Sequence, residues 1–464
     1  MRIERDTLGD VQVPDDALYG AQTQRAVENY PISGLREHPA FVRAFILLKK
    51  AAALANMELS TLDEKLGRAI VAACDDVLAK EDKYRSQFVV DVFQAGAGTS
   101  FNMNCNEVIA NLANLKLGGK VGQYKPVNPN DHVNMSQSTN DVFPTALRIS
   151  TVDLLGLLIP QLERLRTALK EKGDQFAAVI KSGRTHLQDA VPVTLGQEFA
   201  AYAAAMQRAN RLLEDASTEL LDLGIGGTAT GTGINTPVGY RHTVVRYLNE
   251  LTGLRFKAAE DLREPMQSQL PVVAVSAALR NLALELTRIT NDLRLLSSGP
   301  QTGLAEILLP AVQPGSSIMP GKVNPSMLEC MNQVLFHIVG ADTAIAYASQ
   351  AGQLELNVMM PLMAFEITFS IEILKNFLPV FVEKCVRGIE ADRARMEAYY
   401  ISSPALATAL NPLIGYAAAA EIAKESAKTG TPIPDLLRKK KLLSEEKIRE
   451  IFTPEFLAAQ ADRK

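Results

Sequence analysis

Long stripes of apolar residues at helical spacing constrain the fold of this sequence more than any other feature. Three segments repeat apolar side chains at alternating steps of three and four, over residues 155–169, 199–223 and 279–296. This period is typical of helices that pack nearly parallel, each with one stripe buried against its neighbours. Each helix is expected to span about 20 residues or more, whereas helices of globular domains average about 11. The sequence therefore predicts an extended bundle of long helices.

A fourth segment, roughly residues 353–391, is apolar on most sides. A helix that is apolar all round is buried all round, and Pro361 is expected to kink this one or to lie in its first turn. A single chain offers too little neighbouring mass to bury so many long helices. We therefore expect other copies of the chain to complete the bundle, as a homo-oligomer.

The two ends of the chain differ from this middle part. Residues 1–141 mix short helical stretches with connections rich in glycine and asparagine, and residues 396–464 are charged and form a smaller region. Strand signal is weak throughout, and 464 residues suffice for about three domains. The sequence predicts a mostly helical N-terminal domain over 1–141, a central long-helix domain over 142–395 and a small helical C-terminal domain over 396–464.

The composition excludes several classes of protein. Hydrophobic residues make up 47% of the chain and charged residues 22%, as in globular proteins rather than disordered or collagen-like ones. The formal net charge of −4 provides no field that favours nucleic acid, and the basic run at 439–443 is interpreted as a solvated helix end. No run of about 18 uninterrupted apolar residues occurs, so no membrane span is expected.

Cysteine and histidine spacing argues against disulfide and metal frameworks. The four cysteines lie far apart and form no CxxC pair, which is typical of reduced thiols in a cytosol. The five histidines share no HxH or HExxH spacing, so no metal site is expected. The first residues, MRIERDTLGD, contain no apolar signal region. These observations predict a soluble protein of the cytoplasm.

Four segments interrupt the helical pattern with hydroxyls, amides and glycines, at 96–111, 130–145, 183–198 and 315–325. Each lies at the end of a long helix or between helices. Small polar side chains clustered in this way supply neutral hydrogen-bond donors, which can bind an anion and stabilise negative charge that grows during a reaction. The four segments are therefore the candidates for catalytic chemistry.

Three of these segments also have a purely structural interpretation. Thr99 and Ser100 are good N-caps for the asparagine-rich helix that follows them. Residues 136–141 resemble a helix cap too, although one cap does not need four hydrogen-bonding residues in a row. His186 is a lone histidine, and a lone histidine is more often a satisfied buried residue than a catalyst. From the residues alone, both interpretations stay open for each segment.

The fourth segment, GSSIMPGKVNP at 315–325, is the hardest to explain structurally. Its glycines, serines and prolines are typical of a mobile active-site loop. It is not a P-loop, because no hydroxyl follows Lys322 and no strand precedes it, and Ser316 is not part of a GxSxG elbow. What remains is a flexible loop that carries a serine and one cation, followed by Glu329 about one helical turn later.

This loop resembles the signature loop of the aspartase/fumarase superfamily, whose members eliminate across a Cα–Cβ bond to release fumarate. The resemblance extends to YGAQTQRAVEN at 19–29, to LNPLIGY at 410–416 and to the other three polar segments, so it spans nearly the whole chain. It implies a mainly all-α, three-domain fold with a central bundle of long helices shared in a homotetramer. It also implies that segments of three subunits compose each active site, and that the reaction needs no cofactor and no metal.

Two branches of this superfamily compete, the aspartate ammonia-lyases and the class II fumarases. The string NMSQSTND at 134–141 is similar to aspartases, since fumarases usually carry lysine at Met135 and serine at Thr139. Ser100 and the pair at 353–354 are also similar to aspartases. The resemblance therefore favours an aspartase that deaminates L-aspartate reversibly.

Two other positions discriminate less well between these branches. Fumarases and some aspartases have histidine at His186, where many aspartases have glutamine. Met360 departs from the acidic residue that several aspartases carry before the proline. A class II fumarase, which converts L-malate to fumarate and water, is therefore the alternative.

The resemblance implies a role for the polar residues of the four segments. Ser316 is the implied base that removes the Cβ proton of L-aspartate. The implied β-carboxylate ligands are all hydroxyl residues: Thr99, Ser138, Thr139 and Ser317. The implied neighbours of the amino group are Asn140, Thr185 and His186, of which His186 is also counted as catalytic. The implied ligands of the α-carboxylate are Lys322 and Asn324, and Glu329 supports His186 and Lys322 from a second layer.

The chemistry of the reaction fits these roles. The Cβ proton is very weakly acidic, and it leaves only if the second negative charge spreads into the adjacent carboxylate as an enediolate. Hydroxyl donors aimed at that carboxylate stabilise the dianion more than the ground state. Ser316 is a poor base at neutral pH, so it needs loop amides, the charge of Lys322 and exclusion of water to become an alkoxide. Anti elimination of ammonia then gives fumarate.

Two non-catalytic alternatives also exist. One branch of the superfamily has been recruited as a structural lens protein, but every residue of the implied site is intact in this sequence. A helical scaffold with an unrelated pocket would require the four hydroxyl-rich segments to be accidental. Both alternatives predict that neither L-aspartate nor L-malate yields fumarate.

Overall fold

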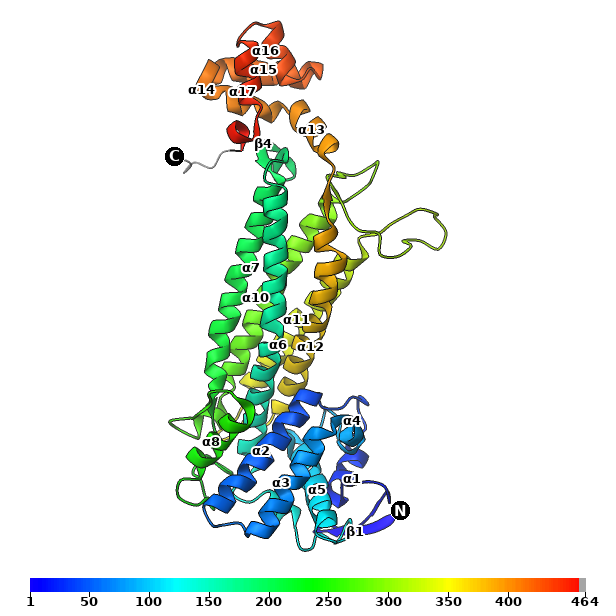
Figure 1. The fold of residues 1–464 in the computed structure, drawn as a ribbon, viewed down its shortest axis with the longest axis vertical. Coiled ribbons are helices and arrows are strands. Elements are labelled where there is room, and N and C mark those ends of the chain that lie inside the picture. The colour runs from blue at the N-terminus through cyan, green and yellow to red at the C-terminus, as the bar shows by residue number, and fades with distance from the viewer. Residues whose placement is uncertain (459–464) are drawn as a thin grey trace. The chain divides into compact units, whose positions relative to one another are not determined.

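The computed structural model describes residues 1–458, in which helices dominate (Figure 1). The all-α prediction is confirmed, and the strands form four small two-stranded sheets. Five helices are long: α6 (Thr139–Gln175), α7 (Leu195–Ser217), α10 (Leu270–Leu296), α11 (Ser326–Gln350) and α12 (Met360–Lys384). The N-terminal helices are α1 (Ala21–Asn29), α2 (Pro39–Glu58), α3 (Glu64–Ala79), α4 (Glu81–Tyr84) and α5 (Thr99–Lys116), and α8 (Tyr240–Thr252) and α9 (Glu264–Gln267) follow α7.

The C-terminal helices and the strands are short. The C-terminal helices are α13 (Arg393–Ser402), α14 (Asn411–Ile414), α15 (Tyr416–Thr429), α16 (Ile433–Lys439), α17 (Glu445–Ile451) and α18 (Pro454–Leu457). The strand pairs are β1 (Arg2–Asp6) with β2 (Gly9–Val13), β3 (Ile180–Thr185) with β4 (Gln188–Thr194), β5 (Asp222–Leu223) with β6 (Lys257–Ala258), and β7 (Ile307–Leu308) with β8 (Glu390–Ala391). All pairs are antiparallel except β5 and β6.

The predicted long helices are present. Stripe leucines such as Leu158, Leu213 and Leu286 are fully buried on α6, α7 and α10. The fourth predicted helix is shorter than the expected 353–391, because it begins at Met360 with Pro361 in its first turn. α6 and α10 are long and apolar enough to cross a membrane, with 72% and 44% of their most apolar stretches buried inside the protein. Core helices meet the same criteria, so this finding alone does not indicate a span.

The chain divides into two compact units, each built from separate stretches of sequence. Unit 1 comprises residues 1–159, 211–281 and 336–375, and unit 2 comprises 160–210, 282–335 and the residues from 376 onward. All five long helices contribute residues to both units. The division into domains 1–141, 142–395 and 396–464 stays a prediction.

An aromatic cluster in unit 1 joins α2, α5 and α6. The Phe41 ring lies 4.9 Å from Phe143 and 5.2 Å from Phe45, and Phe45 lies 5.1 Å from Phe101. Aromatic pairs at such spacings add to the stability gained from burial of the rings. Because Phe101 and Phe143 are the third residue of α5 and the fifth residue of α6, the cluster fixes the N-terminal ends of these two helices.

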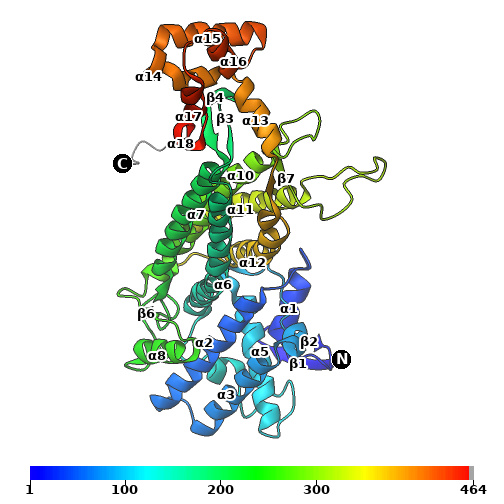
Figure 2. The same ribbon diagram turned by 45° about the horizontal axis from the view of Figure 1, so that its top comes forward.

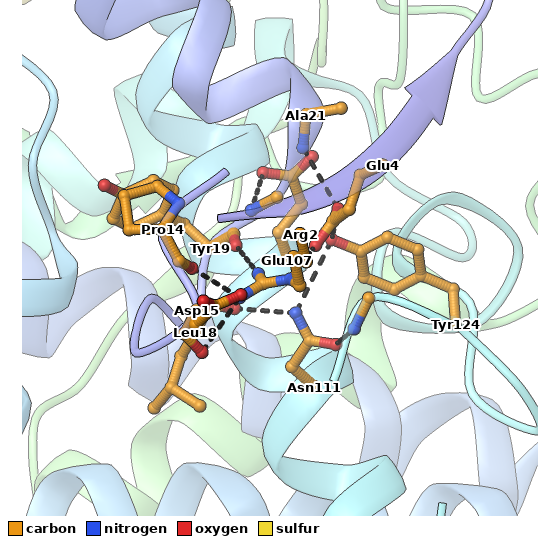
Figure 3. Close-up of polar contacts among 12 residues, drawn as sticks. Arg2, Glu4, Pro14, Asp15, Leu18, Tyr19, Ala21, Glu107, Asn111 and Tyr124 are labelled. Atoms are coloured by element: carbon orange, nitrogen blue, oxygen red, sulfur yellow. Dashed lines mark hydrogen bonds and ion pairs between the residues drawn. The ribbon is translucent and has the colours of Figure 1, made fainter. Parts of the chain in front are cut away.

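The segment at 19–29 that resembles the superfamily starts on the side of α5 (Figure 3). Glu107 Oε2 accepts the N–H of Gly20 at 2.8 Å, and Asn111 Nδ2 donates to the carbonyl of Leu18 at 2.7 Å. Burial raises the pKa of Glu107, and the hydrogen bonds it accepts act in the opposite direction. Arg2 donates to the carbonyl of Tyr19 at 2.7 Å. This part of the motif therefore anchors α1 on α5.

Unit 2 contains the hairpin of β3 and β4, which packs against the C-terminal helices. Figure 2 shows the hairpin beside α13. The C-terminal helices have a small core of their own, formed by buried side chains that include Leu406, Leu410, Ile422, Ile433 and Leu437. The hairpin therefore packs on a folded group of helices.

Candidate active site

The first polar segment lies at the start of α5. Gly98 adopts a left-handed φ of 83°, and a Cβ at this position would lie 2.0 Å from the Phe143 ring. Only glycine fits here, and the chain then turns directly into α5 with Thr99 as its first helical residue. The interpretation of Thr99 and Ser100 as caps is wrong, since the N-cap residue is Gly98 and no side chain bonds to it. Thr99 is exposed in this first turn.

The second segment begins α6 with a reciprocal cap. Ser138 Oγ accepts the N–H of Asn140 at 3.2 Å, and Asp141 Oδ1 accepts the N–H of Ser138 at 2.9 Å. Asp141 Oδ2 accepts two further N–H groups, from Gly226 at 3.0 Å and Thr228 at 2.9 Å. Burial raises the pKa of Asp141 to about 6. The cap interpretation is therefore correct, and the capped segment holds residues 138–140 in a fixed conformation.

A fully buried lysine that sequence reasoning missed lies beneath this segment. Lys49 of α2 donates to Asn134 Oδ1 and to Gln137 Oε1, both at 3.0 Å. Burial lowers the pKa of Lys49 to about 7. The position of Lys49 within the apolar and small residues of α2 is the only sequence signal of its burial.

The third segment forms the tip of the β3–β4 hairpin in unit 2. Thr185 pairs with Gln188 across a two-residue turn in which His186 has φ 55° and Leu187 has φ 58°. Two left-handed residues give a primed hairpin turn, which normally favours asparagine and glycine. Backbone strain in non-glycine residues is concentrated at functional sites. The interpretation of His186 as a buried residue is wrong, because His186 is exposed, as is Thr185.

A cluster of buried charges anchors this hairpin. Glu306, which is fully buried, lies 2.9 Å from Arg184 Nη2 and 3.2 Å from Lys181 Nζ. Lys181 also pairs with Glu198 of α7 at 2.7 Å. Both cations lie on β3, and Arg184 directly precedes Thr185. Sequence reasoning missed this cluster, because nothing in the linear pattern links Glu306 to residues more than a hundred positions earlier.

The fourth segment is a loop whose base is closed by hydrogen bonds. The N–H of Gly315 donates to the carbonyl of Lys322 at 2.8 Å, and Asn324 Nδ2 donates to the carbonyl of Gly315 at 2.7 Å. Ser316 Oγ accepts the N–H groups of Ile318 at 3.2 Å and Met319 at 3.0 Å. Hydrogen bonds donated to an oxygen favour its negatively charged form.

The implied site residues are divided between the two units. Unit 1 holds Thr99, Ser138, Thr139 and Asn140, and the bond from Asn102 Nδ2 to Thr139 Oγ1 at 2.9 Å joins the starts of α5 and α6. Unit 2 holds the remaining seven: Thr185, His186, Ser316, Ser317, Lys322, Asn324 and Glu329. Ser317 and Lys322 are exposed on the loop, and Glu329 lies in the first turn of α11.

Comparison with protein families agrees with these features. A family model described as lyase matches residues 9–340, and one described as the fumarase C C-terminus matches residues 406–459. The chain belongs to the aspartase/fumarase superfamily. The superfamily membership inferred from the loop at 315–325 is thus confirmed, as is the prediction of a lyase.

Relatives within the superfamily match over nearly the whole chain. Aspartate ammonia-lyase of Bacillus subtilis (strain 168) is 48% identical over 98% of this chain and 95% of its own length, and that of Escherichia coli (strain K12) is 45% identical over the same shares. Two solved structures confirm the aspartase/fumarase-like fold. A fumarate lyase:delta crystallin from Brucella melitensis bound to cobalt has a TM-score of 0.95 and 46% identity, covering 99% of this chain and 100% of its own. A class II fumarase from Schistosoma mansoni has a TM-score of 0.94 and 36% identity, covering 99% of both chains.

Proposed function

We propose that this chain is a carbon–nitrogen lyase that deaminates L-aspartate reversibly to fumarate and ammonia. The observation that carries this proposal is the identity of 45–48% to aspartate ammonia-lyases over 98% of the chain, against 36% to the class II fumarase. Aspartase-like residues at Ser100, Met135 and Thr139 support the same choice.

In the proposed mechanism Ser316 removes the Cβ proton of L-aspartate. Its Oγ already accepts two backbone N–H groups, and Lys322 of the same loop adds a positive charge, so both favour an alkoxide. The proton moves to Ser316 Oγ, and the electrons of the broken C–H bond spread into the β-carboxylate. They then form the Cα–Cβ double bond as the C–N electrons leave with the amino group.

Hydroxyl donors stabilise the dianion that this proton transfer creates. The proposed β-carboxylate ligands are Thr99, Ser138, Thr139 and Ser317. Ser138 Oγ accepts the N–H of Asn140, which leaves the hydroxyl proton of Ser138 available for the substrate. The interaction strengthens as charge develops, so it lowers the barrier rather than only improving binding.

The remaining residues of the proposed site orient the substrate. Lys322 and Asn324 hold the α-carboxylate, with Glu329 in support. Asn140, Thr185 and His186 surround the amino group. One N–H of Asn324 already fixes the base of the loop at Gly315, so the second remains for the substrate.

We further propose a homotetramer in which three subunits contribute to each site. Apolar side chains on the long helices are exposed in the single chain, such as Leu284 at 51%, Phe336 at 58% and Tyr347 at 66%. Exposed apolar surface on long helices favours association with further copies. The exposed tips at 185–186 and 316–322 can then complete sites built on other subunits.

The cytoplasm is the proposed location of this enzyme. All four cysteines are free, and three of them are buried. Unpaired thiols of this kind are typical of a reducing compartment.

The direct test supplies purified protein with L-aspartate and, separately, with L-malate, and follows fumarate by its ultraviolet absorbance. Fumarate from L-aspartate alone is the expected result. The Ser316→Ala variant serves as the control and should produce little fumarate. Fumarate from L-malate alone would make the chain a fumarase. If the folded protein produced no fumarate from either substrate, both activities would be contradicted.

A further inference from the structure

Lys49, Asn134, Asn102 and Thr139 are linked by a chain of buried hydrogen bonds. Lys49 determines which group donates and which group accepts in each bond of this chain. In its charged form Lys49 is an ammonium, which donates hydrogen bonds and accepts none. Lys49 Nζ lies 3.0 Å from the side-chain oxygen of Asn134, so this atom of Asn134 must be the acceptor. The amide nitrogen of Asn134 accordingly faces the carbonyl of Gln137, at 3.2 Å.

This orientation dictates how two asparagines of α5 are turned. Asn102 and Asn106 lie one helical turn apart, and both are buried. Their Nδ2 atoms lie 3.2 and 3.1 Å from Asn134 Oδ1, so both asparagines donate to it. In the part of the chain that the structure describes, the Oδ1 of each has no hydrogen-bond partner. Buried acceptors without a hydrogen-bond partner are uncommon. Here they result because both asparagines direct their amide nitrogens toward Asn134.

Asn102 and Asn106 differ in their second contact. The Nδ2 of Asn106 also lies 3.5 Å from Met103 Sδ, whereas the Nδ2 of Asn102 also lies 2.9 Å from Thr139 Oγ1. Because Asn102 presents a donor, Thr139 must accept this bond, and its own hydroxyl proton points elsewhere. Among residues 1–458 the structure shows no acceptor for that proton. Thr139 as a whole is 8% exposed, so this residue is nearly buried.

We propose that Asn102 is a positioning residue, which holds the Thr139 hydroxyl as a donor toward the β-carboxylate of the substrate. The inference rests on the proposed function, in which Thr139 binds that carboxylate. A hydroxyl that accepts one hydrogen bond becomes a better donor in the next. Asn102 thereby strengthens a donor at the group where negative charge grows in the transition state. Asn102 itself does not need to touch the substrate.

Asn106 provides a matched control for this role. Asn102→Leu and Asn106→Leu remove side chains of the same size from the same helix, and each removes one bond to Asn134. Only Asn102→Leu also removes the bond to Thr139. A merely structural role would therefore make the two variants alike.

The test measures kcat and KM for L-aspartate in both variants, in Thr139→Val and in the double variant Asn102→Leu/Thr139→Val. We expect kcat to fall about 100-fold in Thr139→Val and about 10-fold or more in Asn102→Leu, as for loss of an oxyanion donor. Asn106→Leu should stay within about threefold of the parent enzyme. The double variant should be no more than about threefold worse than Thr139→Val, because residues that act through one another are not additive.

Several results would overturn the inference. Equal losses in Asn102→Leu and Asn106→Leu, or additive losses in the double variant, would reduce Asn102 to a structural residue. Full activity of Thr139→Val would remove Thr139 from the site and Asn102 with it. A parent enzyme that makes no fumarate from L-aspartate would instead contradict the proposed function.

A second pair of variants covers the case that leucine prevents folding. Asn102→Asp and Asn106→Asp preserve the side-chain volume, and an ionised carboxylate can only accept. In Asn102→Asp the new carboxylate accepts the hydroxyl proton of Thr139, which then no longer points toward the substrate. The kcat should therefore fall more in Asn102→Asp than in Asn106→Asp. The loss should diminish as the pH is lowered and the new carboxyl becomes a donor. Equal losses at every pH would contradict the role of Asn102.

Discussion

At the scale of single residues, Ser316 combines a structural and a chemical task. Its hydroxyl accepts the N–H groups of Ile318 and Met319 and so organises the loop tip. The base of the loop has independent supports in the bonds between Gly315, Lys322 and Asn324. The Ser316→Ala variant therefore keeps the closed base of the loop, and it loses both the hydrogen bonds of the loop tip and the proposed base of the reaction.

Glu37 is a buried residue outside the proposed site whose ionisation affects stability. Its side chain accepts an N–H from Gln94 at 2.9 Å, and its other oxygen has no partner among the described residues. Burial raises the pKa of Glu37 from 4.5 to about 8, and the negative charge of Asp91 adds to this effect. Gln94 in turn accepts the N–H of Phe101 at 2.9 Å, so Glu37 is linked to the start of α5.

We expect Glu37→Gln to stabilise the protein at alkaline pH. Between pH 4.5 and about 8 the folded state retains a proton that the unfolded state has lost, so stability falls as the pH rises through this window. A neutral glutamine removes that loss of stability, which is on the order of 5 kcal/mol above pH 8. Urea midpoints at pH 5 and pH 8.5 measure the difference, with the exposed Glu28→Gln as the control. A gain that is independent of pH would contradict this account.

At the scale of elements, the β3–β4 hairpin depends on its buried anchor. The fully buried Glu306 pairs with both Lys181 and Arg184 of β3, and Lys181 also pairs with Glu198. Removing one partner of a buried ion pair leaves an uncompensated charge. The anchor therefore determines whether Thr185 and His186 are held in place at the exposed tip.

We expect Glu306→Gln to lower stability and activity together. The free energy of unfolding should fall by about 3 kcal/mol, because the partly buried Arg184 loses its carboxylate and the buried Lys181 keeps only Glu198. kcat/KM for L-aspartate should also fall, since the hairpin tip is held less firmly. Urea unfolding and fumarate absorbance measure the two effects. The control is Glu163→Gln, which breaks the exposed pair with Arg166 and should cost less than about 1 kcal/mol; equal costs in both variants would contradict the anchor.

The elements also show what the sequence could predict. The stripes at 155–169 and 279–296 led to long helices because a periodic apolar pattern is written locally along the chain. The hairpin was missed because its turn residues, His186 and Leu187, lack the glycine or asparagine that normally marks such a turn. The family motifs identified the implied site residues, whereas supports such as Lys49 depend on contacts that only the folded chain creates.

At the scale of the whole molecule, the proposed tetramer accounts for two features of the single chain. Only 44% of the most apolar stretch of α10 is buried, although its sequence is that of a core helix. The implied site residues are divided between units 1 and 2, and four of those in unit 2, namely Thr185, His186, Ser317 and Lys322, are exposed. Association of several copies would bury the helix faces and bring tips of one subunit to another.

We expect two inactive variants to restore each other if the sites are composite. Ser316→Ala inactivates the segment at 315–325, and Thr139→Val inactivates the segment at 130–145. In a tetramer that contains both variants, a site can take an intact Ser316 from one subunit and an intact Thr139 from another, and such a site is active. After co-refolding in equal amounts, random assembly gives about one quarter of the sites both intact segments. Fumarate production from L-aspartate should thus recover to about one quarter of the parent activity, whereas each variant refolded alone stays inactive. Size-exclusion chromatography with light scattering checks that every sample is tetrameric. Hybrids that tetramerise normally but remain inactive would show that each site is built within one subunit.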